Sequence, residues 1–180
     1  AHNKDRQNVE HAVHAEAEAM LANIGEIDKV SAIVLGSRNW HPGVIGIVAS
    51  RISRLCHRPT ILVSIDENGI GKGSGRSIPG FSLVAAIEIC TEHLLGGGGH
   101  AMAAGISVKE ENIDAFRIAF QNAAREALSK EEMTAVLELD AEVRLRDLSL
   151  NFFESYKLLE PFGQKNTEPL FLCRRVNPRL

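Results

Sequence analysis

Four consecutive glycines followed by a histidine are the strongest candidate for chemistry in this sequence. They are Gly96 to Gly99 and His100, and a run of small residues continues to Gly105. Each glycine costs roughly 1 kcal/mol of backbone entropy relative to alanine, which is a large cost for a simple linker. We therefore predict a loop whose exposed N–H groups bind a phosphate, with His100 as a further donor. The alternative is a flexible hinge with a surface histidine.

A second candidate, Gly73-Ser74-Gly75-Arg76-Ser77, combines an arginine with two hydroxyl groups. An arginine side chain donates two hydrogen bonds to one phosphate, and Ser74 and Ser77 can add donors. The segment matches neither a P-loop nor a dinucleotide-binding fingerprint. It predicts phosphate binding, with a simple glycine-rich edge strand as the alternative.

The third candidate surrounds the only tryptophan, Trp40, just before a predicted helix. A tryptophan can stack on a base, while His41 and the backbone amides from Gly43 onward can meet a phosphate at the helix N-terminus. The alternative is that Trp40 packs over the edge of a sheet and that His41 caps the helix.

Charge is distributed unevenly along a chain whose net charge is −3. Between residues 30 and 87 the only acidic residues are Asp66 and Glu67. The basic residues of the same segment are Arg38, Arg51, Arg54, Arg58, Lys72 and Arg76. This locally positive segment predicts an anionic ligand such as phosphate or nucleic acid. Alternatively, its first three arginines after Arg38 form the solvated face of a helix.

The sequence argues against several other classes of protein. It contains no Asp-His-His or paired-aspartate motif, so this chain alone cannot build a two-metal centre, and we expect it to bind no metal. Its three cysteines are too scattered for a disulfide framework or a zinc site, which predicts a cytoplasmic protein. No apolar run reaches the roughly 18 residues that a membrane span needs, so no membrane association is expected.

Hydrophobic periodicity predicts the elements that must position these candidates. Helices are expected over residues 9–24, 42–55, 83–94, 113–127 and 148–159, and strands over 31–35, 60–65, 70–78, 106–108, 136–145 and 170–176. Alternate glycines in the strand over 70–78 leave one of its faces almost without side chains, so something can approach its backbone closely. The order of elements predicts an α/β (α+β) fold with a mixed β-sheet flanked by helices.

Together these motifs resemble the DHH phosphoesterase superfamily, and in particular its RecJ family of 5′–3′ single-stranded-DNA exonucleases. The resemblance rests on residues 40–49, 75–81, 97–105 and 159–171. The glycine–histidine motif is shared by the whole superfamily and by a domain of alanyl-tRNA synthetases, whereas the stretch from Leu159 to Gly163 resembles the RecJ family specifically. Lys165 and Thr167 depart from the family pattern, in a loop that is separate from the phosphate-facing motifs.

The resemblance implies a domain organisation. Residues 1–29 would be a long connector helix leaving a catalytic DHH domain, residues 30–132 a DHH-associated nucleic-acid-binding domain, and residues 133–180 the truncated beginning of an OB-fold barrel. Mn²⁺ or Mg²⁺ would lie in the absent DHH domain, so this fragment would bind no cofactor and be inactive alone. The complete protein would act on single-stranded DNA in repair and recombination, as a monomer, with single-stranded-DNA-binding protein as a candidate partner.

The resemblance also places the phosphate-facing residues in a cleft opposite the metal centre, with a supporting catalytic role for His100. The expected substrate-binding residues are Arg38, Trp40, His41, Gly43, Ser74, Arg76, Ser77, Gly97, Gly98, Gly99 and His100.

Two other functions remain open. A DHH-type phosphodiesterase for nanoRNA or cyclic dinucleotides would share the motifs, but such enzymes usually end before a segment like the one after Thr134. A non-enzymatic RNA-binding module like that of alanyl-tRNA synthetase would leave the same segment without a role.

Overall fold

The computed structural model describes residues 2–176, and these fall into two compact units, Ala1–Ala135 and Val136–Leu180. Each unit is described by itself. Among the described residues, no helix combines the length and the apolar character needed to cross a membrane.

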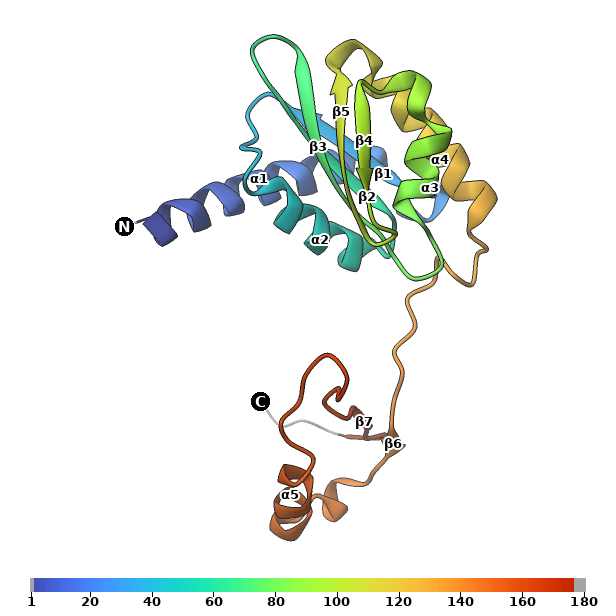
Figure 1. Ribbon diagram of the computed structural model, residues 1–180. Coiled ribbons are helices and arrows are strands. Elements are labelled where there is room, and N and C mark those ends of the chain that lie inside the picture. The colour runs from blue at the N-terminus through green and yellow to red at the C-terminus, as the bar shows by residue number, and fades with distance from the viewer. Residues whose placement is uncertain (1, 177–180) are drawn as a thin grey trace. The chain divides into compact units, whose positions relative to one another are not determined.

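The first unit is built on one five-stranded sheet (Figure 1). Its strands are β1 (Ile33–Ser37), β2 (Thr60–Ile65), β3 (Ile70–Arg76), β4 (Gly96–Gly99) and β5 (Ala103–Lys109), in the order β1-β2-β3-β5-β4. The pair β1–β2 is parallel and the other neighbours are antiparallel, so the predicted mixed sheet is confirmed.

Helices cover the sheet from two sides (Figure 1). The helices are α1 (His2–Ile24), α2 (Ile45–Cys56), α3 (Leu83–Ile89) and α4 (Ile113–Ala127), with short 3₁₀ segments at Ile27–Lys29, Thr91–His93 and Glu110–Asn112. The predicted long N-terminal helix is confirmed as α1. The second predicted helix starts at Ile45 rather than Pro42, because Pro42 lies in a turn ahead of it.

Strand β2 separates two apolar cores. Leu62 points to the side of α1 and α2, where it joins Leu35 and Val48. Ile61 and Val63 point to the side of α3 and α4, where the other core lies. Alternate side chains of a strand point to opposite faces, and because both faces are covered here, all six residues of β2 are buried, including the polar Thr60 and Ser64.

The alternate glycines of β3 lie on the α3–α4 side of the sheet. A Cβ atom added to Gly73 would lie 2.5 Å from Cγ1 of Ile106, and one added to Gly71 would lie 2.5 Å from Cγ1 of Val63. What approaches this backbone so closely is therefore the core itself and not a ligand. The other face of β3 carries Lys72, Ser74 and Arg76.

The four glycines predicted to form a loop instead form β4, the edge strand of the sheet. Gly98 pairs with Gly105 of β5, and the backbone N–H of His100 donates to the carbonyl of Ala103 at 2.8 Å. Glycine has a low intrinsic preference for strands, so this strand depends on the partner that residues 103–109 supply. The prediction of a loop was wrong.

One alternative placed Arg58 on the solvated face of a helix, and the structure contradicts it. Helix α2 ends at Cys56, and Arg58 is only 5% exposed. Its Nε donates to the carbonyl of Val30 at 2.7 Å, and its Nη1 donates to the carbonyl of Met133 at 2.6 Å. This arginine therefore holds the segment after α4 against the start of β2.

The second unit contains helix α5 (Leu150–Lys157), the 3₁₀ segment Leu145–Asp147 and two short parallel strands, β6 (Ala141–Glu142) and β7 (Phe171–Leu172). Its centre is a cluster of rings in which Phe152 meets Phe171 edge to face, with centroids 5.5 Å apart. The hydroxyl of Tyr156 donates to Glu168 at 2.8 Å, and desolvation together with this bond raises the pKa of Tyr156 to about 12.

The packing of β3 yields a stability prediction. Gly73→Ala should lower the free energy of unfolding by about 1–3 kcal/mol, because its Cβ would overlap Ile106 in a filled core. Urea unfolding followed by the fluorescence of Trp40, the only tryptophan and a buried residue of this unit, measures the loss. Gly96→Ala is the control, since no atom lies within 4 Å of the added methyl group. Equal midpoints for the two variants would contradict the account.

Candidate nucleic-acid interface

The polar face of β3, which we define as Lys72, Ser74 and Arg76, continues across the neighbouring strands. Ser74 pairs with Gly105 of β5, and Gly105 pairs in turn with Gly98 of β4. Paired residues of adjacent strands project from the same face. The rows beside the polar face therefore consist largely of backbone, which a ligand can approach closely.

Arg76 and Ser74 form the best-ordered part of this surface. Nη1 of Arg76 donates to Oγ of Ser74 at 3.2 Å and to the carbonyl of Gly75 at 2.7 Å. The first turn of α2 closes over the pair at Gly46, where an added Cβ would lie 3.0 Å from both Nη2 of Arg76 and Oγ of Ser74. Only glycine fits there without displacing one of them.

Gly46 was missed by the sequence analysis, which singled out Gly43 in the same motif. The available signal was a glycine in the first turn of an amphipathic helix, where alanine would give the higher helix propensity. A glycine inside a helical pattern costs about 1 kcal/mol relative to alanine, and here an added methyl group would meet the guanidinium of Arg76.

His100 and the glycine strand form the outer part of the surface. His100 is exposed, and its backbone pairs with Ala103, whose other neighbour in register is Arg76. Nothing lies within 4 Å of a Cβ built on Gly98, whereas a Cβ on Gly97 would meet Ile87 of α3 at 2.9 Å. An edge strand presents unpaired N–H groups along its free side, so β4 offers donors without obstructing side chains.

The segment around Trp40 does not match its predicted role. Trp40 is 3% exposed and belongs to the core beneath α1 and α2, so it offers no free face to a base. Nδ1 of His41 accepts a hydrogen bond from the backbone N–H of Gly43 at 3.0 Å, which closes a local turn. The amide of Gly43 is therefore committed within the chain. The prediction of base stacking was wrong for the buried Trp40, whereas phosphate binding by the exposed His41 stays a prediction.

Two other predicted binding residues have structural partners. Arg38 forms an ion pair with Glu110, and this carboxylate raises the pKa of Arg38 by hydrogen bonding and charge. Oγ of Ser77 donates to the carbonyl of Phe81 at 2.7 Å and so closes the turn before α3. Both side chains therefore have partners within the chain, and phosphate binding by Arg38 and Ser77 stays a prediction.

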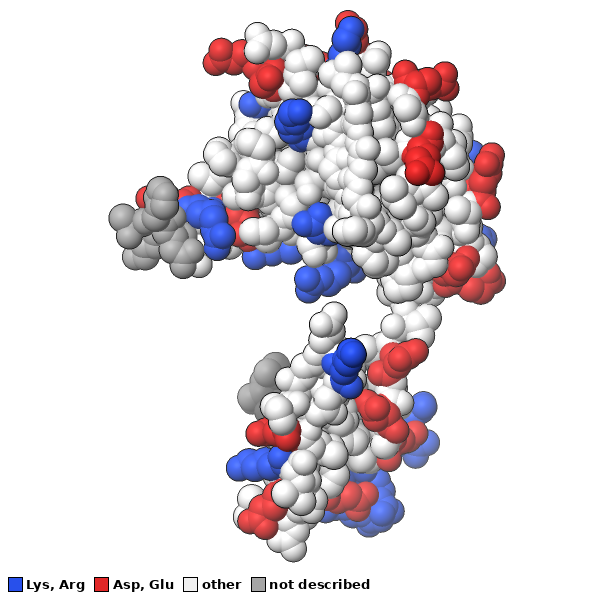
Figure 2. All heavy atoms as spheres, in the orientation of Figure 1, with Lys and Arg blue, Asp and Glu red and all other residues white. Residues whose placement is uncertain are grey.

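The basic residues of the 30–87 segment thus fall into two groups, those with a carboxylate partner and those without one. Arg38, Arg51 and Arg58 each pair with a carboxylate. Among the residues that the structure describes, Lys72, Arg76 and Arg54 have hydrogen bonds but no carboxylate partner. In Figure 2 the acidic side chains gather over the helices and turns, and the surface over β3, β5 and β4 is mostly white with isolated blue groups. The polar face of β3 is therefore the part best suited to an anion.

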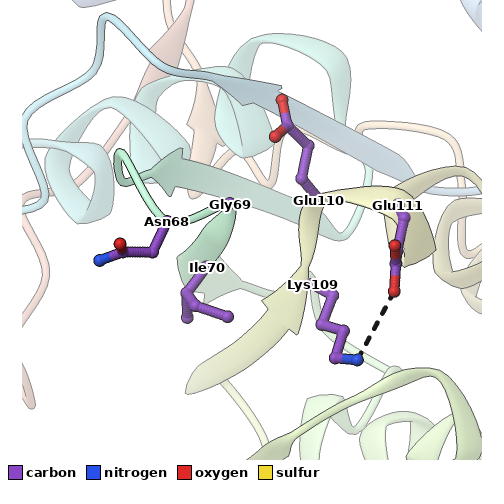
Figure 3. Close-up of a pocket in the computed structure, with 6 residues that line it drawn as sticks. All are labelled: Asn68, Gly69, Ile70, Lys109, Glu110 and Glu111. Atoms are coloured by element: carbon purple, nitrogen blue, oxygen red, sulfur yellow. Dashed lines mark ion pairs between the residues drawn. The ribbon is translucent and has the colours of Figure 1, made fainter.

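A hollow of about 500 Å³ lies between the β2–β3 turn and the end of β5 (Figure 3). Lys109 on its wall is paired with Glu111 at 3.5 Å, and Glu110 is held by Arg38. Its charges are matched internally, so it offers no free cation to an anionic ligand.

The residues present do not fit a catalytic metal. Within residues 2–176, no three His, Cys, Asp or Glu side chains lie together as a metal-binding group would require. A two-metal phosphodiesterase needs such ligands. The polar face of β3 instead presents cations, hydroxyl groups and bare backbone.

Comparison with known proteins identifies related domains and relatives of this chain. The family model of the DHHA1 domain matches residues 28–126, and that of the RecJ OB domain matches residues 139–179. The single-stranded-DNA-specific exonuclease RecJ of Bacillus subtilis is 38% identical over 175 residues, which are 97% of this chain and 22% of the relative. The corresponding protein of Haemophilus influenzae is 36% identical, over 94% of this chain and 30% of its own length.

Solved structures show the same fold. The crystal structure of Thermus thermophilus RecJ in complex with Mg²⁺ superposes with a TM-score of 0.80 at 34% identity, covering 94% of this chain and 25% of that one. The Mn²⁺ complex gives the same score. The chain thus spans less than a third of the length of these relatives.

The contact at Gly46 yields a prediction about the geometry of the site. Gly46→Ala should displace the guanidinium of Arg76, because the added methyl group would sit against Nη2, while the higher helix propensity of alanine offsets part of the cost to stability. The Nε–H resonance of Arg76 in a proton–nitrogen NMR spectrum, identified by its loss in Arg76→Gln, reports the displacement. Ser50→Ala on the same helix is the control, and an Arg76 resonance unchanged in Gly46→Ala would refute the contact.

Proposed function

This chain belongs to the DHHA1 domain family, and from that premise we propose that it is the phosphate-clamping part of a longer exonuclease acting on single-stranded DNA. The observation that carries the proposal is Arg76, a cation without a carboxylate partner among the described residues, held by Ser74 beside an exposed glycine edge. The names of the relatives, which call them single-stranded-DNA-specific exonucleases, support the substrate class.

In this proposal each residue has a separate task. Arg76 donates charge-assisted hydrogen bonds to a phosphate of the strand, and Ser74 keeps its guanidinium in place. The free edge of β4 adds backbone donors at Gly97 and Gly99, whose N–H groups point away from β5. Among the described residues the side chain of His100 has no partner, and it lies in the same row as Arg76, so it can support a reacting phosphate by donating a hydrogen bond.

In this proposal the catalytic metal ions are bound by another part of the longer protein. Because the described residues offer no ligand cluster, we assign Mn²⁺ or Mg²⁺ to another domain of the longer protein. The Mg²⁺ and Mn²⁺ complexes of Thermus thermophilus RecJ support this assignment. A role in DNA repair and recombination and a 5′–3′ direction are part of the same proposal.

Residues 139–179 favour this function over the two alternatives. Their match to the RecJ OB domain gives the segment after Thr134 a role, which neither a nanoRNA or cyclic-dinucleotide phosphodiesterase nor a synthetase-type RNA-binding module provides. The free cysteines Cys56, Cys90 and Cys173 support a reducing compartment such as the cytoplasm. A monomeric state and an interaction with single-stranded-DNA-binding protein stay predictions.

Removing the proposed anchor tests this function. Arg76→Gln should weaken binding of a fluorescent oligothymidylate to the chain by about 1–3 kcal/mol, the scale of a lost charge-assisted hydrogen bond. Fluorescence anisotropy at constant salt gives the affinity. Arg54→Gln is the matched control, since it removes the same charge from an exposed arginine on α2 whose one partner is Ser50. Equal losses in the two variants would mean that the effect is one of net charge and not of this site.

The chain by itself should show no nuclease activity. Hydrolysis through two metal ions needs clustered ligands, which the described residues lack. Incubation of the purified chain with single-stranded DNA and Mn²⁺, followed by gel analysis, is the measurement. Cleavage that persists through repeated purification and co-elutes with the protein would overturn the division of labour proposed above.

A further inference from the structure

We propose that Lys72 and Ser107 form a second phosphate subsite, which binds a phosphate a few nucleotides along the same strand from the one held by Arg76. The inference rests on the proposed function and specifies how much of the single strand this surface holds. Its ligand is the phosphodiester of an extended polynucleotide.

Lys72 has a neutral partner. Its Nζ donates to Oγ of Ser107 on the neighbouring strand at 2.8 Å, and this hydroxyl is its one partner among the described residues. An exposed ammonium that has only a hydroxyl for a partner keeps its full charge and two further donors. Ser107 can hold it in place much as Ser74 holds Arg76.

The spacing of Lys72 and Arg76 suits two phosphates of one strand. Lys72 and Arg76 lie on the same face of β3 four residues apart, which is about 13 Å along a strand. That distance corresponds to roughly two to four nucleotides of a single strand, depending on how far it is stretched beyond the ~3.4 Å rise of duplex DNA. Between the two sites, Ser74 pairs with Gly105 of β5, and beside it Lys72 pairs with Ser107. Both of these β5 residues pair in turn with glycines of β4, so no bulky side chain lies between the two sites.

There is room for a nucleotide beside Lys72. A hollow of about 490 Å³ begins there, with apolar walls from Pro42, Ile65 and Ile70. Its size lies within the range typical of small-ligand sites. The acidic residues that line this hollow, Asp66 and Glu67, belong to the β2–β3 turn. Oδ1 of Asp66 accepts hydrogen bonds from the backbone N–H groups of Asn68 and Ile70.

The dependence of binding affinity on the length of the oligonucleotide distinguishes the second subsite from the first. We would measure binding of oligothymidylates from about two to about eight nucleotides long to the 180-residue chain, as wild type, Lys72→Gln and the control Arg54→Gln. Wild type and the control should gain affinity once the probe is long enough to reach Lys72. Lys72→Gln should lack that gain, which amounts to about tenfold, and its salt slope on long probes should be smaller by ~0.7.

The outcomes distinguish the two proposals. If Arg76→Gln weakens binding of every probe while Lys72→Gln matches wild type at every length, the proposed function stands and the second subsite is refuted. If wild type binds no probe at any length, both fall. A loss in Lys72→Gln that is equal for the shortest and the longest probes would also refute the subsite, because it would indicate a general effect of charge.

Discussion

The two-residue period of strand β3 is the constraint on which the rest of the first unit depends. On its core side, glycines at 71, 73 and 75 allow Val63 and Ile106 to pack directly against the backbone. The same alternation places the polar face of β3 on the opposite side of the sheet. A shift of the strand by one residue would bury charged side chains and open the core. The packing of the core and the composition of the binding surface are therefore set by one choice of register.

Electrostatics then decides which cations of that surface remain available. Ion pairs neutralise Arg38 and Arg51, and Arg58 is buried among carbonyl groups, so a count of basic residues overstates the positive surface. Lys72 and Arg76 escape this because their neighbours across the strands are serine, threonine and alanine and not carboxylates. Hydroxyl partners orient a cation without neutralising it, which suits a surface that must bind and release an anion.

The sequence predicted the features that depend on local pattern. The apolar runs of β1 and β2, the turn at Asn68-Gly69 and the amphipathic α4 follow from periodicity and turn chemistry. It failed where long-range contacts decide. Four glycines are a strand only because β5 pairs with them, and Trp40 is buried only because α1 and α2 cover it. The role of Gly46 depends on Arg76, thirty residues away in sequence, and no local pattern contains that contact.

The composition of the interface also bears on selectivity. Sequence is read through contacts to base edges, whereas phosphate contacts position a strand without reading it. The surface between Arg76 and β4 consists of serine, alanine, histidine and glycine, and its donors are amides, hydroxyls and charged groups suited to phosphates. In the function proposed above, a surface of this kind would position a strand through its phosphates without reading its bases.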